Sequence, residues 1–208
     1  MVWEGRAARR PPIPIRFRKM KATRVAILFS IVFILAGGGY LYWRWLYPYG
    51  VRTCYLPCMT MALVIYADQH EGWFPHDGTT SVESLKQLYP DAGDPVLLAG
   101  ISGDRAAVRA RIAANQPLDE FVSSWVYFPG LRVDDHAAAL IWERKEGLTF
   151  NGHRAEPGSH AVGFVDGHSE QIPAGQWQSF LEEQARLRTG ALDRRRTKEM
   201  TVESGKEE

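Results

Sequence analysis

The residues of this chain that could do chemistry begin with two cysteines, Cys54 and Cys58, which are four positions apart. In an oxidising compartment such a pair first indicates a disulfide. A bridge across one helical turn has awkward geometry, but Pro57 favours a helix that begins between the two cysteines, which relieves the problem. Two packed thiols remain the alternative. Haem attachment requires Cys-x-x-Cys-His, whereas the sequence here reads Cys-Tyr-Leu-Pro-Cys-Met.

The 6 histidines do not have the converging spacing that a zinc site requires. His160 and His168 flank Asp166-Gly167, a dipeptide that favours a two-residue hairpin turn of type I′. Such a turn would place Val165 opposite His168 and keep the two imidazoles apart. Calcium binding at Asp166 would need further carboxylates that the segment does not supply. We therefore interpret Asp166 and Gly167 as turn residues, and we expect no metal site and no cofactor.

No pattern typical of catalysis is present: the chain has no nucleophile elbow, no glycine-rich phosphate loop and no paired-carboxylate signature. The net charge is only +1, which gives no reason to expect a nucleic acid partner. Most aromatic residues, among them Trp73 and Trp125, are interpreted as core. Arg105, Arg109 and Arg111 lie in a helical segment that we interpret as a solvated face, with a docking surface as the alternative. We expect that the chain is not an enzyme.

An uncharged segment at residues 25–43 is long enough to cross a membrane, because nineteen residues rising 1.5 Å each span roughly 29 Å. Tyr40, Tyr42, Trp43 and Trp45 form an aromatic belt at its C-terminal end, suited to the headgroup boundary. Basic residues gather before the segment, at Arg6, Arg9, Arg10, Arg16, Arg18, Lys19, Lys21 and Arg24. This distribution predicts a single-pass protein of the inner membrane with a cytoplasmic N-terminus and a periplasmic C-terminal domain. A cleaved signal peptide is the alternative, and it would also export the domain.

Downstream of the anchor, helical and alternating apolar patterns predict an α+β domain. Met59, Ala62, Leu63, Ile65 and Tyr66 recur at helical spacing and predict a helix that has Pro57 in its first turn and ends near residues 69–72. Strands are expected at residues 124–128, 138–143, 160–165 and 168–172, forming a small antiparallel sheet packed on that helix. Thr80 and Asp104 are expected to cap short helices, and an amphipathic helix at residues 176–187 closes the domain.

Three segments together resemble the pseudopilin-like, prepilin-type proteins related to the major pseudopilin of type II secretion. They read Ile-Tyr-Ala-Asp-Gln-His-Glu-Gly-Trp-Phe-Pro (65–75), Ser-Ser-Trp-Val-Tyr-Phe-Pro-Gly-Leu (123–131) and His-Ala-Val-Gly-Phe-Val-Asp-Gly-His-Ser-Glu (160–170). The resemblance implies a membrane helix followed by an exported α+β domain that can assemble with other subunits. This chain lacks the prepilin peptidase site and the early glutamate of the family, so an uncleaved anchor is expected.

The sequence therefore predicts four regions: a basic cytoplasmic tail (1–24), a transmembrane helix (25–46), an exported pseudopilin-like domain (47–190) and a charged, disordered tail (191–208). The expected function is that of a structural or assembly subunit, with membrane lipid and other membrane or envelope proteins as partners. Two kinds of assembly fit, a secretion or pilus apparatus and another membrane complex that takes the chain as an accessory subunit. The alternative is an exported ligand- or glycan-binding module that uses Trp73 and Trp125, although a small-molecule ligand is not expected.

Overall fold

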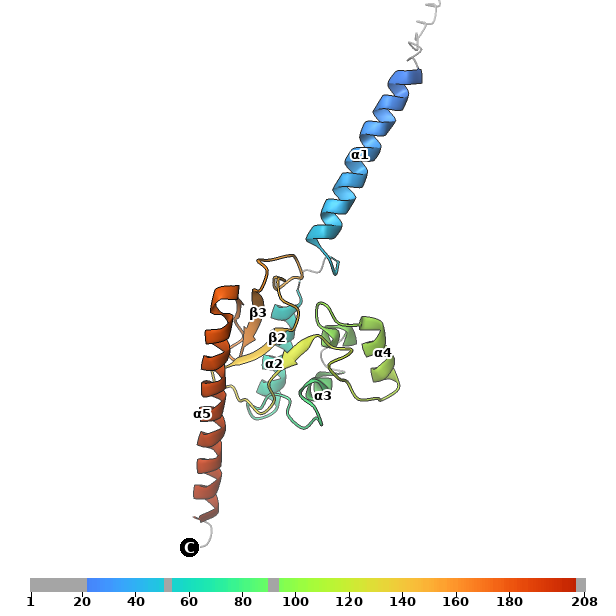
Figure 1. The fold of residues 1–208 in the computed structure, drawn as a ribbon. Helices are drawn as coiled ribbons and strands as arrows, with labels where there is room; N and C mark the ends of the chain where they lie inside the picture. Colours follow the sequence, from blue (N-terminus) through green and yellow to red (C-terminus); the bar gives the residue numbers. More distant parts are fainter. Residues whose placement is uncertain (1–21, 51–53, 90–93, 205–208) are drawn as a thin grey trace, which may run out of the picture. The chain divides into compact units, whose positions relative to one another are not determined.

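The computed structural model describes residues 22–50, 54–89 and 94–204. The chain divides into two compact units, Met1–Tyr42 and Trp43–Glu208, which are described separately below. The first described element is α1 (Ala22–Leu46), which begins in the first unit and ends in the second (Figure 1).

Helix α1 contains a segment, Arg24–Leu46, that is long and apolar enough to cross a membrane by length and composition. None of this segment is buried inside the protein, so its apolar side chains have no protein core to enter. The belt residues Tyr40, Tyr42, Trp43 and Trp45 are all exposed. A single exposed apolar helix near the N-terminus is compatible with a single-pass membrane protein, which agrees with the prediction from the sequence.

The domain after α1 is a four-stranded antiparallel sheet with helices around it, so the predicted α+β class is confirmed. The strands are β1 (Trp125–Tyr127), β2 (Ala139–Glu143), β3 (His160–Phe164) and β4 (Ser169–Ile172), and they follow one another across the sheet in that order. The helices are α2 (Leu56–Gln69), α3 (Ser81–Ser84), η1 (Leu85–Leu88), η2 (Pro95–Ala99), α4 (Arg105–Ala113), η3 (Ala174–Gln176) and α5 (Trp177–Ser204). Pro57 lies in the first turn of α2, and Thr80 and Asp104 accept backbone hydrogen bonds as the caps of α3 and α4.

Both faces of the sheet are covered, which explains why every residue of β2 and β3 is buried. Leu56, Met59 and Leu63 of α2 pack in the larger apolar core on one face. On the other face, α5 runs along the sheet and contributes Trp177 and Phe180 to a second cluster (Figure 1). The sequences of β2 and β3 therefore consist mainly of apolar residues and do not alternate between polar and apolar.

Close approach of α2 to the sheet depends on Gly163 in β3. A Cβ atom at this position would lie 2.4 Å from Thr60 Oγ1 and 3.3 Å from Ile141 Cγ2. Only glycine leaves that space free. On the opposite face, a bulge in β2 between Ala139 and Ile141 leaves the Ala139 N–H outside the ladder, and the buried Gln184 of α5 accepts its hydrogen bond at 2.7 Å. One glycine and one glutamine thus fix the two helices to the sheet.

The turn between β3 and β4 differs from the predicted two-residue connection. Gly163 pairs with Ser169, and the Phe164 N–H donates to His168 O at 3.0 Å, so Phe164 and not Val165 lies opposite His168. Asp166 and Gly167 are both in the turn, but the loop has three residues and includes Val165. Gly167 has φ of +89°, which completes a turn of the three-residue class. Because of this register, the Phe164 and His168 rings stack with centroids 4.2 Å apart.

Helix α5 is longer than the sequence pattern indicated. The prediction ended it at residue 187 and made residues 191–208 a disordered tail, whereas the structure continues the helix to Ser204. The amphipathic pattern does stop near residue 187, but residues 188–204 contain no proline and are rich in arginine, lysine and glutamate, which have good helix propensity. Apolar periodicity alone therefore underestimates the length of this helix.

Arg188 is a cation placed by α5 over an aromatic surface. Its guanidinium carbon lies 3.1 Å from the centroid of Phe128 and 5.2 Å from that of Trp142. Its Nε and Nη2 are buried and have no hydrogen-bond partner among the described residues. Burial lowers the pKa of Arg188 to about 10, so the charge costs free energy at neutral pH despite its contact with the rings.

Arg188→Met is accordingly expected to leave the protein equally stable or to raise its stability by about 1 kcal/mol, because methionine keeps the packing and removes an unpaired charge. Arg188→Ala, which also removes the packing, is expected to be destabilising. Thermal unfolding followed by circular dichroism measures both. A large loss of stability in Arg188→Met would mean that the charge itself stabilises the fold.

Candidate functional site

Cys54 and Cys58 are joined by a disulfide, and their Cα atoms are 5.4 Å apart. Cys54 precedes α2, and Cys58 lies in its first turn beside Pro57. The bridge therefore closes the start of α2, where helical backbone N–H groups have no partner within the helix. Both cysteines are half-buried, and Cys58 contributes to a groove described below.

The histidines are separated by the fold. His160 is buried against the Trp177 ring, with centroids 3.9 Å apart, and burial lowers its pKa. His168 Nδ1 is hydrogen-bonded to the Asp166 carboxylate in the hairpin turn, and the His70 ring stacks on the Tyr66 ring. Among the described residues, no group of three or more His, Cys, Asp or Glu side chains could hold a metal ion.

Trp73 and Trp125, the aromatic residues of the ligand-binding alternative, do not form a platform. Trp125 is fully buried, and its Nε1 donates to Leu97 O at 2.8 Å. Trp73 is half-buried, with the Arg132 guanidinium 4.8 Å above its ring. A sugar could not reach the Trp125 ring without opening the core.

The arginines of α4 lie on a largely exposed helix, of which Val108 is the buried residue, and they form contacts at the protein surface. Arg111 pairs with Asp119 at 2.6 Å, and this hydrogen bond lowers the pKa of the Asp119 carboxyl. Arg109 lies 3.5 Å from Asp94, and Arg105 donates to Tyr49 O at 3.1 Å.

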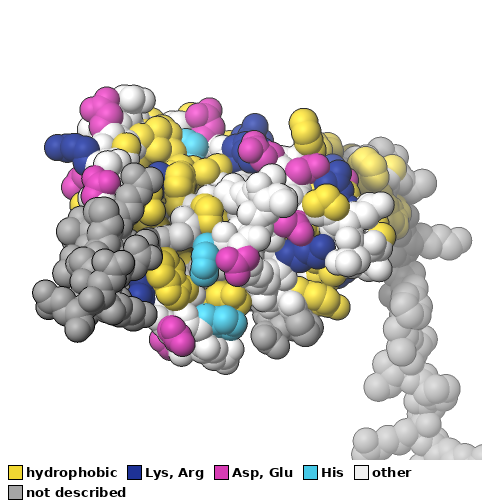
Figure 2. Space-filling view, turned by 90° about the horizontal axis from the view of Figure 1, so that it is seen from below, with side chains coloured by type: hydrophobic (Ala, Val, Ile, Leu, Met, Phe, Trp, Pro, Cys, Tyr) yellow, Lys and Arg dark blue, Asp and Glu magenta, His cyan; other side chains and the backbone are white. Residues whose placement is uncertain are grey.

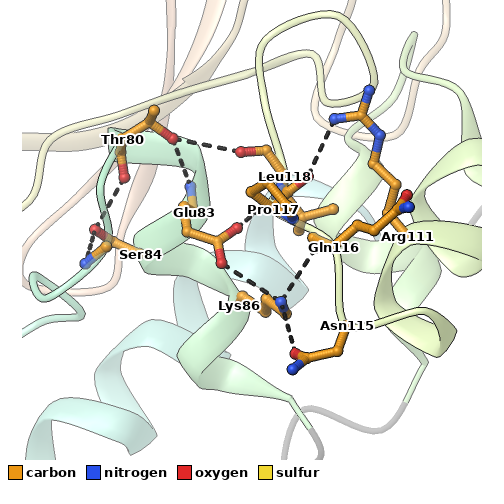
Figure 3. Close-up of polar contacts among 10 residues, drawn as sticks. Thr80, Glu83, Ser84, Lys86, Arg111, Asn115, Gln116, Pro117 and Leu118 are labelled. Atoms are coloured by element: carbon orange, nitrogen blue, oxygen red, sulfur yellow. Dashed lines mark hydrogen bonds and ion pairs between the residues drawn. The ribbon is translucent and has the colours of Figure 1, made fainter.

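A polar network holds the segment after α4 against α3 and η1 (Figure 3). Glu83 accepts from the Leu118 N–H and lies 3.4 Å from Lys86 Nζ. Lys86 also donates to Asn115 Oδ1 and to Gln116 O. These hydrogen bonds connect the two segments and give the network a structural role.

Glu143, at the end of β2, is a buried carboxylate that sequence reasoning missed. Its oxygens accept from the Ser102 hydroxyl at 2.6 Å and from the Ser124 hydroxyl and the Ile101 N–H, both at 2.8 Å. Burial raises the pKa of the Glu143 carboxyl above its ordinary value of 4.5, and the hydrogen bonds oppose this rise. The carboxylate joins the Ile101–Ser102 backbone to the sheet and leaves no acceptor directed at a substrate.

The raised pKa of Glu143 gives a test by pH. As pH rises above about 4.5, the unfolded chain releases this proton before the folded one does, so the group's contribution to stability is greatest at low pH and is lost as pH passes the folded pKa. The stability advantage of the wild type over Glu143→Gln is therefore expected to shrink as pH rises above about 4.5. Thermal unfolding of both proteins across this range measures it. An advantage that grows with pH would contradict the assignment.

The feature that remains without an internal role is an apolar groove on the outer side of α2. It has a volume of about 320 Å³, and its lining contains no charged side chain. Met61 and Ile65 stand at its edge with 58% and 50% of their surface exposed. The lining residues are Cys58, Met61, Ala62, Ile65, Tyr66, Gln69, Leu88 and Leu97.

The groove could have been inferred from the sequence of α2, Leu-Pro-Cys-Met-Thr-Met-Ala-Leu-Val-Ile-Tyr-Ala-Asp-Gln. A helix that packs on a sheet needs only one apolar face, whereas this one is apolar around most of its circumference. Met59 and Leu63 point to the sheet, and Met61 and Ile65 lie two positions further on. Met61 and Ile65 were therefore the sequence features from which an exposed apolar surface on α2 could have been predicted.

Figure 2 shows acidic and basic side chains interspersed with hydrophobic ones on the face seen from below, with no extended area of one charge. Comparisons with protein-family models, with curated proteins and with solved structures find no match for this chain.

Proposed function

We propose that the chain is a membrane-tethered assembly subunit, whose exported domain docks through the groove of α2 onto another membrane or envelope protein. The observation that carries the proposal is the pair of exposed apolar side chains, Met61 and Ile65, beside a groove whose lining is uncharged. Contiguous exposed apolar surface on a soluble domain is typical of an interaction site.

The character of the groove indicates what would occupy it. A lining of aliphatic side chains, with Tyr66 and Gln69 as the polar members, suits apolar side chains of a protein and offers nothing to a phosphate, a carboxylate or a nucleic acid. Only residues 47–55 separate α1 from α2. Nine residues extend at most about 31 Å, which keeps the groove within reach of other proteins at the membrane surface.

The topology completes the proposal. The basic residues that precede the apolar segment support an anchor in the inner membrane with a cytoplasmic N-terminus, which would make the domain periplasmic. The disulfide between Cys54 and Cys58 suits that oxidising compartment. We propose a pseudopilin-like ancestry for the domain, with an uncleaved anchor and a place in a secretion or pilus assembly or in another membrane complex.

Gentle detergent extraction from native membranes, followed by sizing and mass-spectrometric identification of what co-migrates, tests this function. The expected result is a stoichiometric complex with one or more membrane or envelope proteins. Components of a secretion or pilus apparatus would indicate a filament role, and components of a bioenergetic or transport complex would indicate an accessory subunit. A lone monomer in mild detergent would contradict the proposal.

A further inference from the structure

The end of α1 is met by a loop that is distant in sequence, the connection between β2 and β3. The Arg154 N–H donates to Leu46 O at 3.1 Å, and Arg154 Nε donates to Trp45 O at 2.6 Å. The Arg154 guanidinium carbon also lies 5.3 Å from the centroid of the Trp45 ring. The last carbonyls of a helix have no partner within it, and here a single arginine supplies donors to two of them.

The loop that carries Arg154 is held in shape by its own contacts. The Thr149 N–H donates to His153 O at 2.9 Å, and the Ala155 N–H donates to Gly147 O at 2.9 Å. The His153 ring meets the Tyr47 ring edge to face, with centroids 4.4 Å apart. Arg154 thus lies in a hairpin loop whose backbone is ordered by hydrogen bonds.

Within the described ranges, no acidic side chain is paired with Arg154. The Arg154 side chain is exposed. Nε is used by Trp45 O, while neither Nη atom has a hydrogen bond to a described residue. Arg44, one position before Trp45, is a second exposed cation in the last turn of α1. Arg154 therefore lies over an indole that is 55% exposed, and Arg44 adjoins that indole in the sequence.

The position of Arg44 and Trp45 along α1 indicates which kind of anion would meet them. The uncharged segment 25–43 accounts for roughly 29 Å, about the thickness of the hydrocarbon core, so Arg44 and Trp45 fall at the level of the lipid headgroups. Arg154, which touches Trp45, falls at the same level. A planar guanidinium with two unused nitrogens suits a phosphate with paired oxygens, and aromatic side chains suit the adjoining boundary.

We propose that Arg154, together with Arg44 and the Trp45 ring, binds the phosphate of an anionic phospholipid where α1 leaves the membrane. The exported domain then has a second contact with the bilayer besides its anchor. This inference rests on the membrane anchoring in the proposed function, but not on docking at the groove of α2.

The test uses the full chain, purified in mild detergent and titrated with phosphatidylglycerol or phosphatidylcholine, with bound lipid counted by native mass spectrometry. The wild type is expected to prefer phosphatidylglycerol. One basic residue near an anionic surface contributes about fivefold in affinity, so Arg154→Gln is expected to lose about fivefold of that preference. Arg154→Lys keeps the cation and should retain most of it. Arg186→Gln, which removes an exposed arginine from α5, is the matched control and should not change it.

An unchanged lipid preference in Arg154→Gln, with Arg154→Lys and Arg186→Gln also unchanged, would overturn the proposal. Displacement of phosphatidylglycerol by millimolar inorganic phosphate would overturn the assignment to a lipid. Carbonate extraction of native membranes separates this failure from a failure of the anchor: release of the chain into the soluble fraction would remove the membrane on which both proposals depend.

Discussion

Trp125→Ala is expected to lower the free energy of unfolding by about 4 kcal/mol, which is a large part of the stability of a domain of this size. Trp125 is fully buried in β1 and packs in the core that α2 also enters. Its Nε1 donates to Leu97 O at 2.8 Å and so joins the sheet to η2. Removing the indole leaves a cavity and removes one of two hydrogen bonds to Leu97 O, which also accepts from the Gly100 N–H at 3.3 Å.

Urea unfolding of the full chain in detergent micelles, followed by near-ultraviolet circular dichroism, measures this loss. Trp73→Ala is the matched control, because Trp73 is half-buried and its main partner is the Arg132 cation. Its expected cost is about 1 kcal/mol. Equal costs for the two substitutions would mean that Trp125 is less essential to the core than its burial indicates.

Met61→Ser together with Ile65→Ser is expected to weaken the association of the chain with its partner by about 2–4 kcal/mol, or roughly 30- to 1,000-fold. Met61 is 58% exposed and Ile65 is 50% exposed, so the loss of these two side chains should cost the fold little. Quantitative co-purification from native membranes, with the variant expressed at the wild-type level, measures the effect.

Phe121→Ser is the control for that pair. Phe121 is 93% exposed and lies outside the groove, so the substitution removes a large exposed apolar side chain without touching the proposed interface. Phe121→Ser should keep the wild-type yield of partner. Loss of the partner in Phe121→Ser alone would move the interface to the other side of the domain.

The sequence was sufficient for the elements and their order. Aromatic and β-branched runs bounded by turn residues located the strands, and helical apolar spacing located most helices, to within a few residues. Thr80, Asp104 and Pro57 identified helix starts because each satisfies or avoids an unpaired N–H in the first turn.

The register of the β3–β4 turn and the long-range polar contacts could not be predicted from the sequence. Asp166-Gly167 fits both a two-residue and a three-residue turn, and the choice depends on where β4 pairs, which a dipeptide does not encode. Glu143 lies next to Arg144 and Lys145 in a charged run, which predicts an exposed residue. Its burial and its hydrogen bonds with Ile101, Ser102 and Ser124 could not be inferred from that pattern. Arg154 and Trp45 are separated by 109 residues.

The most direct test of docking through α2 is site-specific photo-crosslinking in native membranes, with the photoreactive residue placed at Ile65 or, as control, at the exposed Gln178 of α5. We expect Ile65 to crosslink to the same membrane or envelope protein that co-migrates with the chain in detergent, and Gln178 not to do so. Equal crosslinking from both positions, or none from Ile65 in an intact complex, would contradict the account.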